Sequence, residues 1–500
     1  GVQTCALPIC VNGNFRTSAG SWTSPMTEQK FQGAAIGSFI EYATAQDTTG
    51  AFFAGIKSDE NTKKAVLQFA MATAPSYEWS EFVTISSVDA DAANPKIDTD
   101  GKGNIAVLWD EGGKIKLGSK SASTEIWNIN TVSPEGVKAA NPSIVVDDSG
   151  NAISTWQVFK ERSLKLEGGI NKWIDGHEQI VANYLPAGAG IETVQSQNWQ
   201  DEGYFSLAAS AHYPQVKVDN NGNALAIWRW FNGENYQIMA SYRAKIAISD
   251  AQIAEPWSSP RSISPRGMDA NHATREISGS AIAFDSSGNA QVVWTVVDNG
   301  LYRIQTSTLD FRQIPYNGGN ISRSTPVTVS QHVDSEGNIL SLSNAQLPSI
   351  TLDIDGTATI AWQQVAPTGI SQVLVSRKDA AARGMLLSTG QSANWYWPTL
   401  LPWSMPELIS RKDEHAFHPT AFGSGDDKNN PIVVWVQKST DRLFKGTSES
   451  ALREIAIAEW SYGVPDVSDP KKLVPTSDIW PVASNGDSYM KHFDQYGGNF

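Results

Sequence analysis

The chain has 500 residues, of which 40% are hydrophobic and 18% charged, and its formal net charge at pH 7 is −14. This surplus of acidic side chains excludes a basic nucleic-acid-binding surface, because phosphate binding requires clustered Lys and Arg. No apolar run approaches the roughly 18 residues of a membrane-spanning helix, so we expect no transmembrane segment.

The two ends of the sequence are expected to lie outside the main domain. Residues 1–9, GVQTCALPI, resemble a translated sequencing adapter, so we interpret 1–10 as an artefact and 11–28 as the end of a truncated repeat. Cys5 and Cys10 both fall in this segment, and we therefore expect no disulfide in the fold. Residues 481–500 are expected to begin a further, truncated repeat.

One pattern recurs seven times between residues 29 and 480. An acidic residue is followed three positions later by a turn residue, and a large apolar residue comes six positions after that turn. The seven sets are Asp47/Gly50/Ile56, Asp100/Gly103/Trp109, Asp147/Gly150/Trp156, Asp219/Gly222/Trp228, Asp285/Gly288/Trp294, Asp353/Gly356/Trp362 and Asp426/Asn429/Trp435. The spacing of the turns varies between 47 and 73 residues, which indicates one supersecondary unit with insertions of different length.

Each unit is predicted to contain four short strands. In one repeat these are PQVKVD (214–219), NALAIW (223–228), YQIMASYR (236–243) and WSSPRSIS (257–264), and Gly222 supplies the left-handed conformation of the first turn. NALAIW is apolar on both faces, so it must be covered on both sides. We therefore predict an all-β fold, a β-propeller of seven or eight four-stranded antiparallel blades, in which the repeat tryptophans pack between blades.

The repeat unit, as in residues 214–228, resembles the blades of secreted bacterial β-propeller repeat proteins that are distantly similar to sialidase-like propellers. The aspartate box of sialidases is absent, because here the aromatic residue follows the glycine by six positions instead of three. The resemblance implies an extracellular, cell-surface or periplasmic location. It does not imply a reaction, because propellers support many different activities.

Candidate binding residues are expected in the loops that lead from the fourth strand of one unit to the first strand of the next. The longest of these segments is placed from about Val181 to Ala211. Exposed rings and acids there are typical of ligand binding. The predicted ligand-binding residues are Trp199, Asp201, Glu202, Tyr204 and Trp230.

Five of the seven histidines, among them His212, are also assigned to these loops. Neutral imidazole beside a carboxylate can act as a base or bind a metal, although polar side chains in solvated loops are the alternative interpretation. The catalytic candidates are His272, Arg275, Glu276, His332, Asp413, His415 and His418.

The sequence contains no spaced metal-ligand motif such as HExxH. The segment from Ile97 to Asn104 resembles a calcium loop but lacks a distal glutamate, and its DxxG pattern is typical of a hairpin turn in which Asp accepts hydrogen bonds from the turn amides. We therefore expect neither a metal nor another cofactor.

Two classes of function remain open. The first is a non-catalytic binding or scaffold propeller that recognises a glycan or a protein through its loop-rich face. The alternative is a carbohydrate-active enzyme, a glycoside hydrolase or polysaccharide lyase, with its site on the same face. An enzyme should bring two or three acids, bases or histidines within hydrogen-bond distance, whereas a binding module should present dispersed polar groups and rings.

Overall fold

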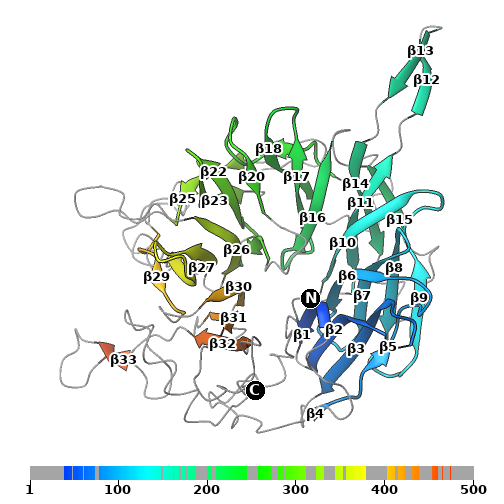
Figure 1. Ribbon diagram of the computed structural model, residues 1–500, viewed down its shortest axis with the longest axis horizontal. Helices are drawn as coiled ribbons and strands as arrows, with labels where there is room; N and C mark the ends of the chain where they lie inside the picture. The colour runs from blue at the N-terminus through cyan, green and yellow to red at the C-terminus, as the bar shows by residue number, and fades with distance from the viewer. Residues whose placement is uncertain are drawn as a thin grey trace. The chain divides into compact units, whose positions relative to one another are not determined.

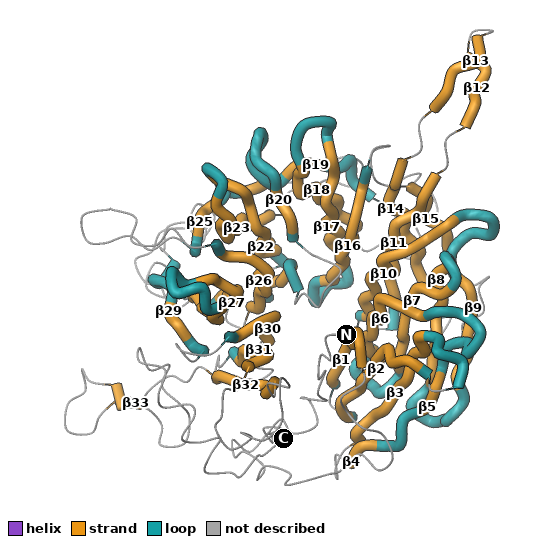
Figure 2. Tube along the Cα trace, in the orientation of Figure 1, coloured by secondary structure: helices purple, strands orange, loops and turns teal. Residues whose placement is uncertain are grey.

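The structure is a computed structural model. The residues that it describes are 39–47, 49–59, 61–73, 78–147, 150–160, 163–167, 170–174, 177–185, 200–204, 210–244, 257–272, 280–286, 288–310, 322–330, 344–352, 356–378, 403–410, 415–422, 431–438, 453–459, 464–465 and 473–474. These residues form strands and connecting turns without a helix (Figure 2), so the predicted all-β fold is confirmed. They divide into two compact units. The described part of the first unit ends at Gly267, and that of the second begins at Met268.

The first unit contains four successive antiparallel sheets, labelled in Figure 1. Sheet 1 consists of β1 (Phe39–Gln46), β2 (Gly50–Ser58), β3 (Ala65–Thr73), β4 (Glu78–Trp79) and β5 (Val83–Thr84). Sheet 2 consists of β6 (Ala92–Thr99), β7 (Ile105–Glu111), β8 (Lys114–Lys120) and β9 (Trp127–Thr131). Sheet 3 consists of β10 (Lys138–Val146), β11 (Ala152–Lys160), β14 (His177–Leu185) and β15 (Gln200–Tyr204), and sheet 4 of β16 (Ala211–Val218), β17 (Ala224–Phe231), β18 (Tyr236–Arg243) and β19 (Arg261–Ser262).

The second unit continues the series. Sheet 5 consists of β20 (Ala270–Asn271), β21 (Ile282–Phe284), β22 (Ala290–Asp298), β23 (Leu301–Asp310), β24 (Ser322–Arg323) and β25 (Val327–Thr328). Sheet 6 consists of β26 (Ala345–Leu352), β27 (Ala358–Val365), β28 (Ser371–Lys378) and β29 (Glu407–Leu408). Sheet 7 consists of β30 (Ala416–Phe422), β31 (Ile432–Lys438) and β32 (Arg453–Glu459), and β33 (Val464–Pro465) pairs with β34 (Leu473–Val474).

Strand order within the four-stranded sheets follows the predicted four-strand unit. In sheet 4 each strand pairs antiparallel with the next, in the order β16, β17, β18 and β19. In sheet 5 the first and fourth positions are each divided into two short strands, because β20 and β21 both pair with β22, and β24 and β25 both pair with β23. Sheet 3 contains an insertion, the hairpin β12 (Ser163–Glu167) and β13 (Ile170–Ile174), whose strands pair only with each other (Figure 1).

Successive sheets pack face to face through apolar side chains. In the first unit one cluster joins sheets 1 and 2 around Trp109, a second joins sheets 2 and 3 around Trp156, and a third joins sheets 3 and 4 around Trp228. In the second unit a cluster joins sheets 6 and 7 around Trp435. The six repeat tryptophans Trp109, Trp156, Trp228, Trp294, Trp362 and Trp435 are between 0% and 3% exposed. Burial of both sheet faces is what the two-sided apolar strands require.

The first strands of successive sheets in the first unit also contact each other. β1 lies against β6, β6 against β10, and β10 against β16. The first strands of successive sheets in this unit are therefore neighbours.

The aspartate turns join the first strand of a sheet to the second. In sheet 4, Asp219 Oδ1 accepts hydrogen bonds from the N–H groups of Asn221 and Asn223, both at 2.8 Å, and Asp219 Oδ2 accepts one from Asn223 Nδ2 at 2.9 Å. The same bonds to the asparagine four residues later are made by Asp100, Asp147 and Asp285. Gly222 has a φ of 81°. The predicted role of these aspartates as turn-forming groups is confirmed.

Candidate functional site

Five first strands share an irregularity at the same place. The residue before a proline has a positive φ there, and the pairing register shifts across it. These residues are Asn94 (φ 51°), Asn141 (54°), Tyr213 (53°), Leu347 (54°) and His418 (53°), followed by Pro95, Pro142, Pro214, Pro348 and Pro419. The bulge removes two residues from regular pairing, so their polar groups can bond outside the strand pair.

The backbone N–H of the bulge residue binds a side chain of the preceding sheet. Asn141 N donates to Asp110 Oδ2 at 3.2 Å, and His418 N donates to Gln363 Oε1 at 3.4 Å. Asp110 and Gln363 each follow the buried tryptophan of a second strand directly. In sheet 2 the acceptor is different, because Asn94 N donates to Glu41 Oε2 of β1 at 2.5 Å. A bulge N–H therefore links sheets in both units.

In the first unit these links join into a continuous row of hydrogen bonds across four sheets. Asn94 Nδ2 donates to Asp110 Oδ2 at 2.5 Å, and Asn141 Nδ2 donates to Gln157 Oε1 at 2.8 Å. The other end of the Gln157 amide lies 3.1 Å from His212 Nδ1. We call the six residues Glu41, Asn94, Asp110, Asn141, Gln157 and His212 the polar ladder.

Asp110 is the electrostatic centre of the ladder. Desolvation raises its pKa to about 7, and the charge of Glu41 adds to this rise, while the hydrogen bonds from Asn94 and Asn141 and the charge of Lys96 act in the opposite direction. Asp110 Oδ1 is buried and has no hydrogen-bond partner among the described residues. One carboxylate oxygen is thus tied into the ladder and the other is not.

Lys96 and His212 have shifted pKa values as well. Desolvation lowers the pKa of Lys96, against the charges of Glu41 and Asp110. The Lys96 residue is nevertheless exposed to solvent. Desolvation also lowers the pKa of His212, with the charge of Glu178 opposing the shift and that of Arg229 adding to it. A neutral His212 can accept through Nδ1 the hydrogen bond that the Gln157 amide offers.

Comparison of the repeats shows that the hydrogen bond from the bulge N–H to the preceding sheet does not require a charged acceptor. Gln363 occupies in sheet 6 the position that Asp110 occupies in sheet 2, and its neutral amide oxygen accepts the same kind of bond. A half-buried carboxylate is harder to desolvate than an amide. The acidic group of Asp110 is therefore not explained by the link between sheets, and we regard it as the leading functional group of the ladder.

The histidines occupy places other than those predicted. The expectation that they lie in loops between the fourth and first strands is wrong for His212 in β16 and His418 in β30, and His272 and His415 directly flank β20 and β30. The first strand continues on both sides of the bulge proline, whereas the sequence pattern predicted its start at the proline. The His272 side chain is 1% exposed. His415 Nδ1 accepts a hydrogen bond from Ser371 N at 3.2 Å.

The segment from Val181 to Ala211 is not a loop of the predicted kind. Val181 lies in β14, the third strand of sheet 3, and Asp201, Glu202 and Tyr204 lie in β15, its fourth strand. The reason is the inserted hairpin β12–β13, whose alternating sequence resembles a third and fourth strand and precedes the real ones. Trp199, Arg275, Glu276, His332 and Asp413 lie outside the described residues.

Trp230 is the predicted ligand-binding residue whose side chain the structure describes. It lies in β17, is half-buried, and packs against the cluster between sheets 3 and 4. Its register partner is Ala211, and the adjacent pair is Arg229 with His212, so Trp230 lies beside the end of the ladder.

Sequence reasoning missed five members of the ladder: Glu41, Asn94, Asp110, Asn141 and Gln157. Two signals were present in the sequence. Asn94-Pro95 and Asn141-Pro142 each begin six residues before a turn aspartate, and Asp110 and Gln157 each follow a repeat tryptophan. A residue that recurs at a fixed position of the repeat, but whose side-chain chemistry differs from that of its counterparts in other repeats, would have indicated these five residues.

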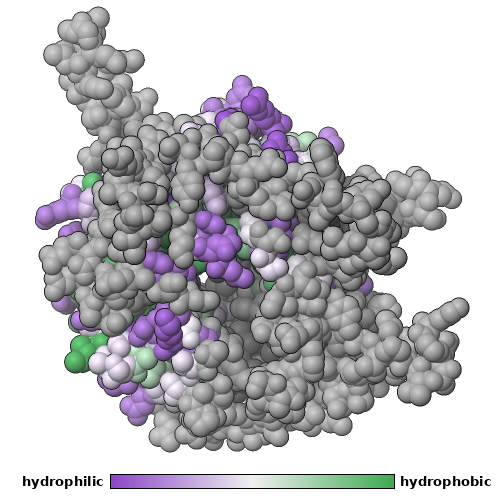
Figure 3. Space-filling view, turned by 180° about the vertical axis from the view of Figure 1, so that it is seen from behind, coloured by the Kyte–Doolittle hydropathy of each residue, from purple (hydrophilic) through white to green (hydrophobic). Residues whose placement is uncertain are grey.

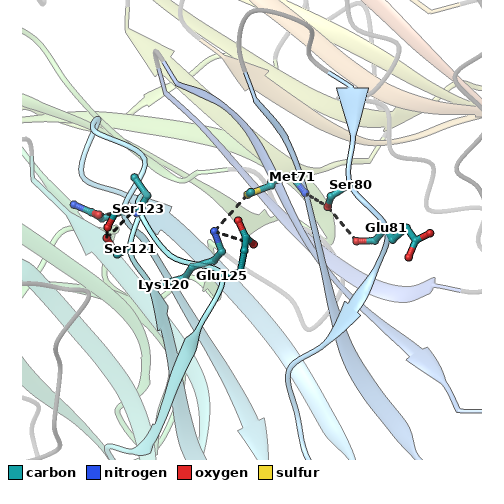
Figure 4. Close-up of polar contacts among 9 residues, drawn as sticks. Met71, Ser80, Glu81, Lys120, Ser121, Ser123 and Glu125 are labelled. Atoms are coloured by element: carbon teal, nitrogen blue, oxygen red, sulfur yellow. Dashed lines mark hydrogen bonds and ion pairs between the residues drawn. The ribbon is translucent and has the colours of Figure 1, made fainter.

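A second polar group lies at the other end of sheets 1 and 2 (Figure 4). Lys120, the last residue of β8, pairs with Glu125 at 3.5 Å between Nζ and Oε2, and its Nζ lies 3.8 Å from the sulfur of Met71 in β3. The Lys120 side chain is 3% exposed and that of Glu125 is 84% exposed. Lys120 pairs in register with Ile105, next to the aspartate turn, so this contact links the sheets away from the ladder.

Two further observations concern the described part of the chain. Within it, no group of three or more His, Cys, Asp and Glu side chains is placed to hold a metal ion. No helix in that part is long and apolar enough to cross a membrane.

No protein family and no curated protein matches the sequence. Among solved structures, a protein of unknown function from Dyadobacter fermentans is 10% identical, with a TM-score of 0.37, and the match covers 74% of this chain and 94% of that one. The NanB sialidase of Streptococcus pneumoniae is 10% identical (TM-score 0.36; 81% and 65% covered). An exo-β-1,3-galactanase of Phanerochaete chrysosporium is 11% identical (TM-score 0.31; 90% and 92% covered).

Proposed function

We propose that this chain is a β-propeller of seven or eight blades, exported by a bacterium, that binds a glycan at the polar ladder. The serial packing of antiparallel sheets around buried tryptophans supports the propeller architecture. The observation that carries the binding function is the unbroken row of side-chain amides, carboxylates and imidazole from Glu41 to His212.

A glycan fits this row better than a protein partner does. Sugar hydroxyls both donate and accept hydrogen bonds, and a few fixed polar groups are what orient such a ligand. Protein interfaces instead centre on buried apolar and aromatic anchors. The described residues of the face in Figure 3 are mostly hydrophilic.

Asp110 favours a second candidate function, that of a carbohydrate-active enzyme. A carboxyl group with a pKa raised to about 7 can donate a proton near neutral pH, and Glu41 supplies a second carboxylate that shares Asn94 as a hydrogen-bond donor. Two carboxyl groups in different environments are the usual equipment for cleaving a glycosidic bond. Asp110 would be the acid in such a reaction.

A glycan array tests the binding function. Fluorescently labelled protein is compared with Asn94→Ala, in the ladder, and with Asn223→Ala, which makes the same substitution in an aspartate turn at the opposite end of a sheet. We expect Asn94→Ala to lose the glycans that the unchanged chain binds, and Asn223→Ala to keep them. Equal binding by all three proteins, or binding of no glycan at all, would overturn the proposal.

Mass spectrometry of the bound glycans then separates the two functions. If the chain only binds, each glycan is recovered intact after prolonged incubation. If the chain is an enzyme, shorter products accumulate, and Asp110→Asn abolishes them while the glycan still binds.

A further inference from the structure

Arg229 breaks the chemical pattern of the ladder. It follows Trp228 in β17, the register position that Asp110, Gln157 and Gln363 hold in their sheets. Those three side chains carry oxygens that accept hydrogen bonds, whereas a guanidinium is only a donor. Arg229 therefore cannot accept a bulge N–H in the way Asp110 and Gln363 do.

The Arg229 guanidinium is held by two aromatic rings. Its Cζ lies 4.3 Å from the ring centroid of Tyr236 and 5.2 Å from that of Tyr213. Arg229 pairs in register with His212, the last member of the ladder. These cation–π contacts restrain the guanidinium without using its N–H groups as hydrogen-bond donors. The residue as a whole is half-buried.

The charge of Arg229 is not neutralised within the described part of the chain. Its Nε is buried without a hydrogen-bond partner there, and none of the described carboxylates forms an ion pair with it. Neighbouring His212 has a lowered pKa, which leaves Arg229 as the cation of this cluster at neutral pH. The acidic group whose charge acts on His212 in this cluster is Glu178.

We infer that Arg229, in cation–π contact with Tyr213 and Tyr236, is a subsite for an oxyanion, the carboxylate or sulfate group of an acidic polysaccharide. The planar guanidinium matches the geometry of such a group with two parallel charge-assisted hydrogen bonds. The inference rests on the proposed function in one respect, that the anion is carried by a glycan lying along the ladder.

Isothermal titration calorimetry at constant ionic strength tests this inference with three polymers. Polygalacturonate carries carboxylates, dextran sulfate carries sulfates, and dextran carries neither. Arg229→Gln removes the charge, Arg229→Lys keeps it without the planar fork, and Lys217→Gln removes an exposed charge from the same sheet as a matched control. We expect Arg229→Gln to weaken binding of at least one anionic polymer about tenfold or more, Arg229→Lys to fall between, and Lys217→Gln to change it less than about twofold.

Equal affinity of Arg229→Gln and the unchanged chain for both anionic polymers would overturn the inference, provided that the two proteins have the same melting temperature. The polymer that loses affinity identifies the anion as carboxylate or sulfate. The result is separable from the glycan array. Loss of binding in Asn94→Ala without any effect of Arg229→Gln keeps the proposed function and rejects this subsite. The reverse outcome keeps an anion site at Arg229 and rejects both the ladder as the binding face and the position of the glycan along it.

Discussion

Asn141 connects the third sheet to the second, because its backbone N–H donates to Asp110 Oδ2 at 3.2 Å while its side chain donates to Gln157 at 2.8 Å. Asp110 thus belongs to a link that depends on a bulge and a proline in another sheet. The same carboxyl group has a raised pKa and an oxygen without a partner among the described residues. Its structural and chemical properties can be separated by substitution.

Asp110 predicts how stability depends on pH. Its pKa is about 7 in the folded chain against an ordinary value of 3.8, so the folded state binds more protons between these values. The free energy of unfolding, relative to Asp110→Asn, should therefore fall as pH rises from about 4 to about 7 and stay constant above. We expect a total decrease on the order of 2 kcal/mol after allowance for partial solvent screening. Urea titrations from pH 4.5 to 8.5 measure it, and a difference that is constant or grows with pH contradicts the assignment.

Two buried tryptophans should respond differently to the same substitution. Trp109 Nε1 donates to Glu111 Oε2 at 3.1 Å, whereas the buried Trp156 Nε1 has no partner among the described residues. Both indoles are 0% exposed. Phenylalanine removes similar volume at either place, but at position 109 it also removes a hydrogen bond to a charged group. Trp109→Phe should lower the free energy of unfolding by about 1 to 2 kcal/mol more than Trp156→Phe, and equal losses in chemical denaturation would refute this.

Leu347 predicts an unusual preference for glycine. Its φ is 54°, a conformation that disfavours residues with a Cβ by about 1 to 2 kcal/mol. Leu347→Gly should therefore be more stable than Leu347→Ala by about 1 kcal/mol. At neighbouring Gln346, which lacks the positive φ, the alanine variant should be the more stable one. Thermal unfolding of the four variants measures both differences, and the same preference at both positions would show that the bulge has no such role.

The aspartate turns predict insensitivity to chelators. Because Asp219 accepts three hydrogen bonds from its own turn, Asp219→Ala should lower stability by about 1 to 2 kcal/mol. Asp219→Asn keeps one acceptor oxygen and should lose less. EDTA should leave the melting temperature of the unchanged chain where it is, since the turn amides already occupy these carboxylates. A fall in melting temperature with EDTA that calcium reverses would instead assign the turns to a metal.

Much of the fold could be predicted because its determinants are local. The alternation in residues 224–228 and the turn at Gly222 both lie within a few positions of the strands they define, and β16 to β18 follow them. The prediction failed in sheet 3, where the hairpin β12–β13 has the same alternation as a strand pair of the sheet but pairs only with itself. The alternation of apolar residues shows which face of a strand is apolar, but it does not show with which other strand that strand pairs.

The candidate site could not be predicted in the same way. Asp110 and Asn141 are 31 positions apart, and Gln157 and His212 are 55 apart, so their bonds depend on how whole sheets pack. The sequence drew attention to histidines, because imidazole is chemically conspicuous, and passed over asparagine and glutamine. Once the bulge is known, the Asn-Pro pairs and the residue after each tryptophan indicate the positions of the ladder residues.

Hydrogen–deuterium exchange tests most directly whether the ladder is the binding face, using the glycan that binds best on the array. The amides of Asn94 and Asn141 donate within the ladder, so they report on it, whereas the turn of residues 219–223 reports on the opposite end of a sheet. We predict slower exchange in the bulge peptides around Asn94 and Asn141 when the glycan is bound, with the turn unchanged. Protection confined to the aspartate turns would contradict the account.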